Sequence, residues 1–243
     1  MVDLDSISIE NNDNQISIKI KSYPVVHHFY HIYCGVDYAG REGSWIPAVD
    51  LHLNSIKEYG LVDHISTMHV GLVGNDHHRI QAQQLIKDHG INFTVVAESM
   101  NGFEQVTQNQ LYKFAQTNNG HVLYAHTKGS FNFNDMNNNW QKSMTYLNVV
   151  KWRECVDQLK NHDAVGAYWY DFSSDAARMG PHTGQKWFAG TFWWANLNRI
   201  RDIGHGPTEY TRWDAEVWIG QIPDISIYNL APSGAAGELI EWV

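Results

Sequence analysis

The chain has 243 residues, of which 43% are hydrophobic and 18% are charged, and its formal net charge at pH 7 is −9. This length and apolar content allow a substantial buried core in one domain. The negative charge excludes a broad electrostatic surface for nucleic acid, so an anionic ligand would have to be held by a few local donors.

Residues 1–24 are polar, with weakly alternating isoleucines, which predicts a short hairpin with "NNDN" as its turn. From residue 25 onward, buried strands alternate with amphipathic helices. The predicted strands cover 25–35, 64–74, 91–99, 121–129 and 163–171, and the predicted helices cover 45–60, 76–90, 103–120 and 139–161. Asp76 is the expected N-cap of the second helix.

This alternation of strand and helix is typical of a mostly parallel sheet with helices on both faces. The predicted fold class is therefore α/β, with a single Rossmann-type domain over residues 25–243. After residue 172 the rhythm changes, and a strand at 185–196, a helix at 212–221 and a strand at 225–231 follow.

The N-terminus and the two cysteines indicate a compartment. The first residues, Met-Val-Asp-Leu-Asp, lack the basic and apolar regions of a signal peptide. No apolar run reaches the roughly 18 residues of a membrane span. Cys34 and Cys155 lie in apolar segments, which predicts buried free thiols rather than a disulfide framework. We therefore expect a cytoplasmic protein without a membrane span.

Polar residues gather where the strand at 121–129 ends, because the apolar run 122–125 breaks into His126, Thr127, Lys128 and Gly129. In open α/β sheets, ligands bind outside the carboxyl ends of the strands, where Gly35, Gly74 and Glu98 should also lie. Lysine can neutralise a phosphate, threonine and backbone N–H groups can donate to its oxygens, and glycine allows close approach. A histidine can donate to an anion or bind a divalent metal. This cluster predicts an anion site, with a polar surface loop as the alternative.

The glycines at positions 35, 40 and 43 do not have the spacing of a dinucleotide-binding motif, and the chain contains no P-loop motif. A dinucleotide oxidoreductase or a P-loop enzyme is therefore disfavoured.

A second group of candidate residues lies in "FAGTFWWAN" (188–196) and "RWDAEVWIG" (212–220). Asp214 follows Thr211 by three residues, as in a capping box, which gives this carboxylate a structural role. Glu216 stands beside the apolar stripe of the same helix and is the better candidate for a general base, with an exposed helical glutamate as the alternative. On the strand, Trp193 shares a face with Thr191 and is expected at the site, while Trp194 is expected in the core.

The order of these motifs, "VLYAHTKGS", a tryptophan-containing helix, "FAGTFWWAN" and "AEVWIG", resembles the GT-A nucleotide-sugar glycosyltransferases. Within that class it is similar to small bacterial and phage-encoded proteins related to rhamnan-synthesis enzymes, over roughly residues 25–230. The resemblance implies a hexosyltransferase-type enzyme that moves a sugar from a UDP-sugar or GDP-sugar to a hydroxyl acceptor, in particular a glycan. Residues 25–130 would form the nucleotide-sugar half and residues 131–243 the acceptor half.

The resemblance also implies roles for single residues. The donor would contact Tyr33, Gly35, Gly71, Glu98, His126, Thr127, Lys128 and Gly129. The acceptor sugar would contact Gly190, Thr191 and Trp193, and the catalytic carboxylates would be Glu216 and Asp214.

Most GT-A enzymes carry an Asp-X-Asp motif at the end of the strand that corresponds to 122–125, where it holds Mn²⁺ on the diphosphate. This chain has no acidic residue from Ala125 to Lys128. Two hypotheses follow. Either His126 is a single side-chain ligand of a divalent metal such as Mn²⁺, or Lys128 replaces part of the charge of the metal.

Two other functions remain open. A non-catalytic carbohydrate-binding module could use the ten tryptophans to bind sugar without turnover. A metal-dependent phosphoester hydrolase could use the histidines, although the sequence lacks the clustered carboxylates that hold two metals.

Overall fold

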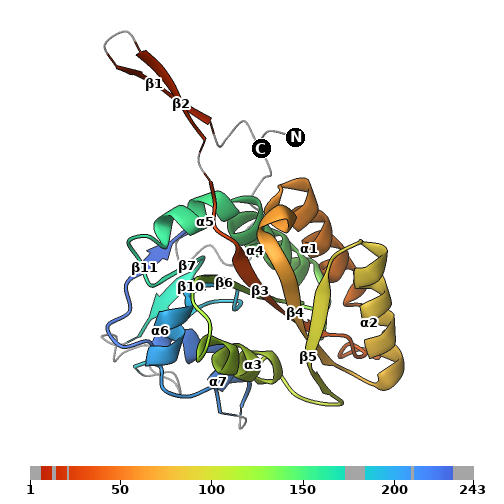
Figure 1. The fold of residues 1–243 in the computed structure, drawn as a ribbon. Helices are drawn as coiled ribbons and strands as arrows, with labels where there is room; N and C mark the ends of the chain where they lie inside the picture. The colour runs from red at the N-terminus through yellow and green to blue at the C-terminus, as the bar shows by residue number, and fades with distance from the viewer. Residues whose placement is uncertain (1–6, 13–14, 21, 173–183, 209–210, 232–243) are drawn as a thin grey trace.

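A computed structural model describes residues 7–12, 15–20, 22–172, 184–208 and 211–231 of the chain. In this described part, the central sheet has seven strands in the order β11-β7-β10-β6-β3-β4-β5 (Figure 1). Its strands are β3 (Val26–Tyr33), β4 (Ile65–Val73), β5 (Phe93–Ser99), β6 (His121–His126), β7 (Ala164–Gly166), β10 (Trp193–Asn196) and β11 (Ile227–Asn229).

Helices cover both faces of the sheet. They are α1 (Ile46–Glu58), α2 (Asp76–Asp88), α3 (Gln105–Ala115), α4 (Asp135–Thr145), α5 (Trp152–Gln158), α6 (Leu197–Asp202) and α7 (Arg212–Glu216), with 3-10 helices η2 (Leu61–His64) and η5 (Trp218–Gln221) and the π-helix η3 (Tyr146–Val150). Apolar side chains of α1, α2, η3 and α5 pack into one core cluster, and those of α3, α6 and η5 pack into a second one. This arrangement confirms the predicted α/β class with a mostly parallel sheet.

The strand order reverses between β3 and β6. From β3 the chain continues to β4 and β5 on one side, whereas β6 pairs with the other side of β3, parallel to it, with His31 beside His126. Such a reversal is the point at which ligands bind in open α/β sheets, because helices leave to opposite faces and open a crevice between the strand ends.

β10 is antiparallel to both of its neighbours, β6 and β7. The chain therefore reaches the carboxyl edge of the parallel strands just before β10 begins, so that Gly190 and Thr191 lie at this edge.

Two predicted strands are interrupted. The strand expected at 163–171 divides into β7 and β8 (Trp169–Asp171), because Tyr168 between them has a φ angle of 61°. The strand expected at 185–196 divides into β9 (Lys186–Phe188) and β10, because Gly190 and Thr191 have φ angles of 86° and 56°. β8 and β9 pair antiparallel in a small separate sheet.

The predicted helices also differ in detail. Asn75, not Asp76, is the N-cap of α2, since its side chain accepts a hydrogen bond from the backbone N–H of His78 at 2.8 Å. The helix expected at 139–161 begins at Asp135 and is divided by η3. The helix expected at 212–221 is α7 followed by η5, and its predicted apolar stripe of Ala215, Trp218, Ile219 and Ile222 is buried.

At the N-terminus, β1 (Ile7–Asn12) pairs antiparallel with β2 (Gln15–Ile20) in a sheet of their own, while part of the expected "NNDN" turn lies outside the described residues. Cys34 and Cys155 are free and buried, as predicted. Among the helices that are described, none has the length and apolar character needed to cross a bilayer.

Candidate functional site

A cavity of about 780 Å³ opens at the carboxyl edge of the parallel strands, on both sides of the point where the strand order reverses. Segments that follow β3, β4, β5 and β6 line this cavity, together with residues of α4 and α7. Its volume lies within the range of small-molecule sites in proteins.

Six of the expected donor residues line the cavity, namely Tyr33, Gly35, His126, Thr127, Lys128 and Gly129. Gly71 and Glu98 do not. A Cβ atom on Gly71 would lie 1.9 Å from Thr107 Oγ1, so this glycine allows α3 to pack closely on β4. Glu98 accepts a hydrogen bond from Gln83 at 3.2 Å and lies 3.7 Å from Arg79, on the side of α2.

Lys128 presents a buried cation to the cavity. Its side chain lies over the ring of Trp140, with Nζ 4.0 Å from the ring centroid, and the residue is only 8% exposed. Within the described residues, no carboxylate lies within 4.0 Å of this ammonium group. Burial lowers the pKa of Lys128, while the negative charges of Glu216 and Glu104 oppose this effect. A buried lysine without a carboxylate partner can form a charge-assisted contact with an anionic ligand.

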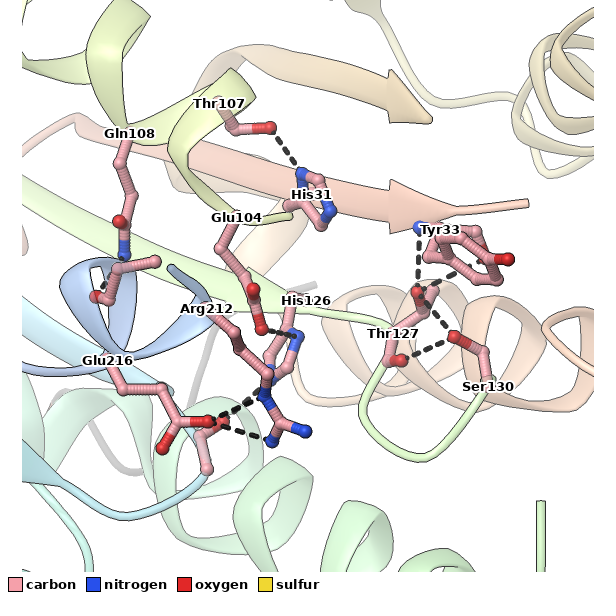
Figure 2. A network of polar contacts seen from close by, with 12 residues as sticks. His31, Tyr33, Glu104, Thr107, Gln108, His126, Thr127, Ser130, Arg212 and Glu216 are labelled. Atoms are coloured by element: carbon pink, nitrogen blue, oxygen red, sulfur yellow. Dashed lines mark hydrogen bonds and ion pairs between the residues drawn. The ribbon is translucent and has the colours of Figure 1, made fainter. Parts of the chain in front are cut away.

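The loop that carries Lys128 is fixed to the neighbouring strand. Thr127 Oγ1 accepts a hydrogen bond from the backbone N–H of Tyr33 at 2.9 Å, and Ser130 donates to the Thr127 carbonyl at 2.8 Å (Figure 2). Gly129 has a φ angle of 79°, and a Cβ atom there would lie 2.7 Å from Asn137 Cβ, so this turn requires glycine.

His126 is held by partners on both nitrogens. Nε2 donates to the Gly190 carbonyl at 2.7 Å, and Nδ1 lies 3.1 Å from the Glu104 carboxylate (Figure 2). Burial alone would raise the pKa of Glu104, but the hydrogen bond and the charge of His126 hold this pKa well below its usual range. Glu104 and His126 thus form a buried pair at the wall of the cavity.

His31 lies beside this pair and also lines the cavity. Its Nδ1 makes a 2.8 Å hydrogen bond with Thr107 Oγ1 (Figure 2). Burial lowers the pKa of His31 to about 4, with Glu104 opposing and His126 adding to the effect. His31 is therefore a neutral imidazole near pH 7.

Glu216 and Asp214, the two expected catalytic carboxylates, do not line the cavity; Arg212 from the same helix does. Glu216 is 5% exposed, and its Oε1 accepts a hydrogen bond from Arg212 Nε at 2.9 Å and forms an ion pair with Nη2 of the same guanidinium at 2.8 Å (Figure 2). Asp214 closes the predicted capping box, since its Oδ2 accepts from the Thr211 backbone N–H at 2.8 Å. Glu216 thus orients Arg212, and Asp214 stabilises the start of the helix.

The expected acceptor residues lie behind the wall of the cavity. Trp193 is fully buried, with its ring stacked on Tyr124 at a centroid distance of 5.0 Å, so it does not reach a ligand in the cavity. Gly190 contacts the site through its carbonyl on His126. Thr191 is 1% exposed, and its hydroxyl makes no hydrogen bond to another described residue. Trp194 packs in the core, as expected.

The mouth of the cavity is apolar. The exposed residues Val36, Met100, Phe103 and Phe131 all line it, and Phe131 meets the ring of Tyr33 edge-to-face at 5.7 Å. Exposed apolar side chains that gather around a cavity are typical of a binding site for a ligand with an apolar or aromatic part.

The side chains at this site do not fit a Mn²⁺ centre. Both nitrogens of His126 are already engaged, and Glu104 is paired with His126. In the described part of the chain, no three His, Cys, Asp or Glu side chains are grouped so that they could hold a metal ion. A hard divalent cation needs several oxygen ligands, which these residues do not supply.

Four residues that line the cavity were not predicted from the sequence: His31, Glu104, Trp140 and Arg212. Of these, only His31 could have been predicted, because it lies near the carboxyl end of a predicted strand, where ligands bind in such sheets. Glu104 and Arg212 belong to the starts of helices, and their direction depends on tertiary packing that local pattern does not encode.

Solved structures with a similar chain path share little sequence with this protein. One is a 4-diphosphocytidyl-2C-methyl-D-erythritol synthase from Anaerococcus prevotii DSM 20548, with 9% identity and a TM-score of 0.45, covering 86% of this chain and 90% of the other. Another is a CMP:2-keto-3-deoxy-manno-octonic acid synthetase complexed with CTP, with 6% identity and a TM-score of 0.47, covering 85% and 90%. A search of curated proteins gave no match.

The chain is an α/β protein with a cavity at the point where the strand order of a mostly parallel sheet reverses. Residues 29–217 match the family described as "Domain of unknown function (DUF8361)". This match spans more than half of the chain, and the protein belongs to that family.

Proposed function

We propose that the protein is a glycosyltransferase that moves a sugar from a nucleoside diphosphate sugar to a hydroxyl acceptor. One observation carries the proposal: the Lys128 ammonium group lies at the cavity wall, over Trp140, without a carboxylate partner among the described residues. A buried cation at the reversal point of an α/β sheet is well suited to an anionic group such as a diphosphate.

In this proposal, the diphosphate lies against Lys128 and the turn at Gly129, with Thr127 holding that turn to β3. The base and ribose lie at the apolar mouth, against Tyr33, Gly35 and Phe131. A nucleobase is flat and apolar on its faces, so it complements the edge-to-face pair of rings. UDP-sugars and GDP-sugars are the donors to test first.

The acceptor hydroxyl, which we propose to be part of a glycan, approaches from the side of α7. Glu216 was the expected general base, but its hydrogen bond from Nε and its ion pair with Nη2 of Arg212 favour a positioning role. In the transfer step, the bond from the sugar carbon to the acceptor oxygen forms as its bond to the diphosphate oxygen breaks. The acceptor proton passes to the leaving diphosphate, whose developing negative charge Arg212 stabilises. Mn²⁺ has no step in this scheme, because the side chains present do not fit it.

The test is to incubate the full chain with UDP-sugars and GDP-sugars, with and without saccharide acceptors, and to measure nucleoside diphosphate release and the glycosylated product. Acceptor-dependent release, lost in Lys128→Met at unchanged melting temperature, would support the proposal. Sugar binding without any release would favour the carbohydrate-binding module. Inorganic phosphate from simple phosphate esters, with no sugar transfer, would favour the hydrolase and contradict the proposal.

A further inference from the structure

Two cations from distant parts of the chain line the same cavity. Lys128 follows β6, and Arg212 begins α7. The two side chains are close enough for the charge of Arg212 to contribute to the lowered pKa of Lys128, after the larger effect of burial. The negative charge of Glu216, whose effect on Lys128 is larger than that of Arg212, offsets the repulsion between the two cations.

The direction of Arg212 is set by Glu216. Both Nε and Nη2 of the guanidinium contact Glu216 Oε1, and Nη1 makes no hydrogen bond to another described residue. The half-exposed Arg212 side chain therefore keeps donors for a ligand, whereas the carboxylate that holds it is buried. Arginine is suited to phosphate because its donors match two oxygens at once.

The acidic groups that would normally hold a metal are missing from this wall or already used. Glu104 is bound to His126, and Glu216 is bound to Arg212. Lys128 and the remaining donors of Arg212 can therefore contact the two negative charges of an esterified diphosphate, and no unpaired carboxylate among the described residues of this wall opposes them.

We propose that the cavity binds nucleoside diphosphates without a divalent cation, with Lys128 and Arg212 in place of the metal and Glu216 as the positioning residue of Arg212. The inference rests on the donor site of the proposed function. It goes further in assigning the neutralising charge to two side chains, one from each half of the chain.

Isothermal titration calorimetry with UDP and GDP tests this directly. The full chain is titrated in EDTA and, separately, in excess Mn²⁺ or Mg²⁺. We expect binding in EDTA that is at least as tight as binding in excess metal, since Mn²⁺ or Mg²⁺ complexes the free diphosphate and competes with the two cations for it. Affinity that appears only with Mn²⁺ or Mg²⁺ would overturn the inference.

Variants identify the cations. In EDTA, Lys128→Met and Arg212→Gln should each weaken binding by about 10- to 100-fold, as expected for loss of a charge-assisted contact. Lys113→Met removes the same charge from the exposed face of α3 and is the matched control, with no change expected. Lys128→Arg retains the charge and should recover part of the affinity if Lys128→Met disturbs the fold. Unchanged affinity in both neutral variants would overturn the inference.

Glu216→Gln tests the positioning role. It should weaken binding in the wild-type background but add little in the Arg212→Gln background, because its effect passes through the guanidinium. An equal loss in both backgrounds would show that Glu216 acts independently and would contradict this role.

The outcomes separate the two proposals. Metal-free binding of UDP or GDP without sugar transfer would support the two-cation site and contradict the glycosyltransferase. Sugar transfer with strictly metal-dependent binding would do the reverse. No binding of either nucleotide under any condition would contradict both.

Discussion

Glu104 and His126 form a buried pair, with Glu104 Oε1 3.1 Å from His126 Nδ1. Glu104 precedes α3, and His126 ends β6 and extends through its other nitrogen to Gly190. The pair thus joins three segments that meet at the cavity, and it holds the wall that carries Lys128 in place.

Removal of one partner should therefore be costly. Glu104→Ala leaves Nδ1 of the buried His126 without its partner, and we expect a loss of about 1–3 kcal/mol in the free energy of unfolding. Urea unfolding at pH 7 measures this value. Glu42→Ala is the control, since that side chain is 77% exposed and should change stability by less than about 0.5 kcal/mol. A loss below about 1 kcal/mol for Glu104→Ala would contradict the importance of the pair.

A second buried pair predicts how stability depends on pH. His28 Nε2 and His52 Nε2 lie 2.7 Å apart, and burial lowers the pKa of His28 to about 4 and that of His52 well below its usual value. The unfolded chain binds protons below pH about 6.5 while the native imidazoles stay neutral. Stability should therefore fall between pH 6.5 and 4, by up to about 1.4 kcal/mol per pH unit for each such histidine.

Urea unfolding at pH 7, 6 and 5 measures this slope. His52→Gln retains an N–H donor for His28 but removes one titrating group, so its slope should be smaller than that of the wild type. The same slope in both proteins would show that this histidine pair does not control acid sensitivity. Glu104 affects stability at lower pH. Its pKa is lowered in the native state, so it stabilises the native state above the unfolded pKa of about 4.3, and this contribution is lost progressively as the pH falls below about 4.3.

The two carboxylates of α7 should behave differently. Asp214→Asn weakens a capping box and should cost about 0.5–1 kcal/mol in stability, with turnover retained. Glu216→Gln weakens the hold on Arg212 and should lower turnover at least tenfold, with a smaller change in stability. Measuring donor turnover and melting temperature of both variants shows which carboxylate supports turnover and which supports stability. An inactive but folded Asp214→Asn beside an active Glu216→Gln would reverse the assignment.

Replacing Thr191 by glycine is expected not to destabilise the protein. Its φ angle of 56° is unfavourable for a β-branched residue, and its buried hydroxyl has no hydrogen-bond partner among the described residues. Thr191→Gly removes both costs and should leave the melting temperature unchanged or raise it, despite the lost methyl contact. Gly190→Ala is the contrasting variant, because its Cβ would lie 2.3 Å from Met144 Sδ, and a lower melting temperature is expected. If Thr191→Gly instead lowered the melting temperature more than Gly190→Ala, the backbone strain at Thr191 would be refuted.

The sequence was sufficient for the order of strands and helices from β3 to β7, because apolar periodicity and glycine stops are local signals. The sequence also placed residues 126–129 at the carboxyl edge of the sheet, where they line the cavity, since the carboxyl ends of parallel strands meet at one edge. It did not reveal that Trp193 is fully buried, because strand alternation gives two faces without saying which one a helix covers. Nor could spacing show that Glu216 bonds to Arg212 one turn away instead of facing the ligand.

The direction of β10 has a consequence for how this protein can diversify. The parallel strands contribute loops that follow them, whereas β10 contributes the residues that precede it, and Gly190 meets His126 at that junction. An insertion before β10 would add residues beside His126 and Trp140 without shifting any of the parallel strand pairs. The length of this segment can thus vary while the turn at 126–129 keeps its place at the cavity.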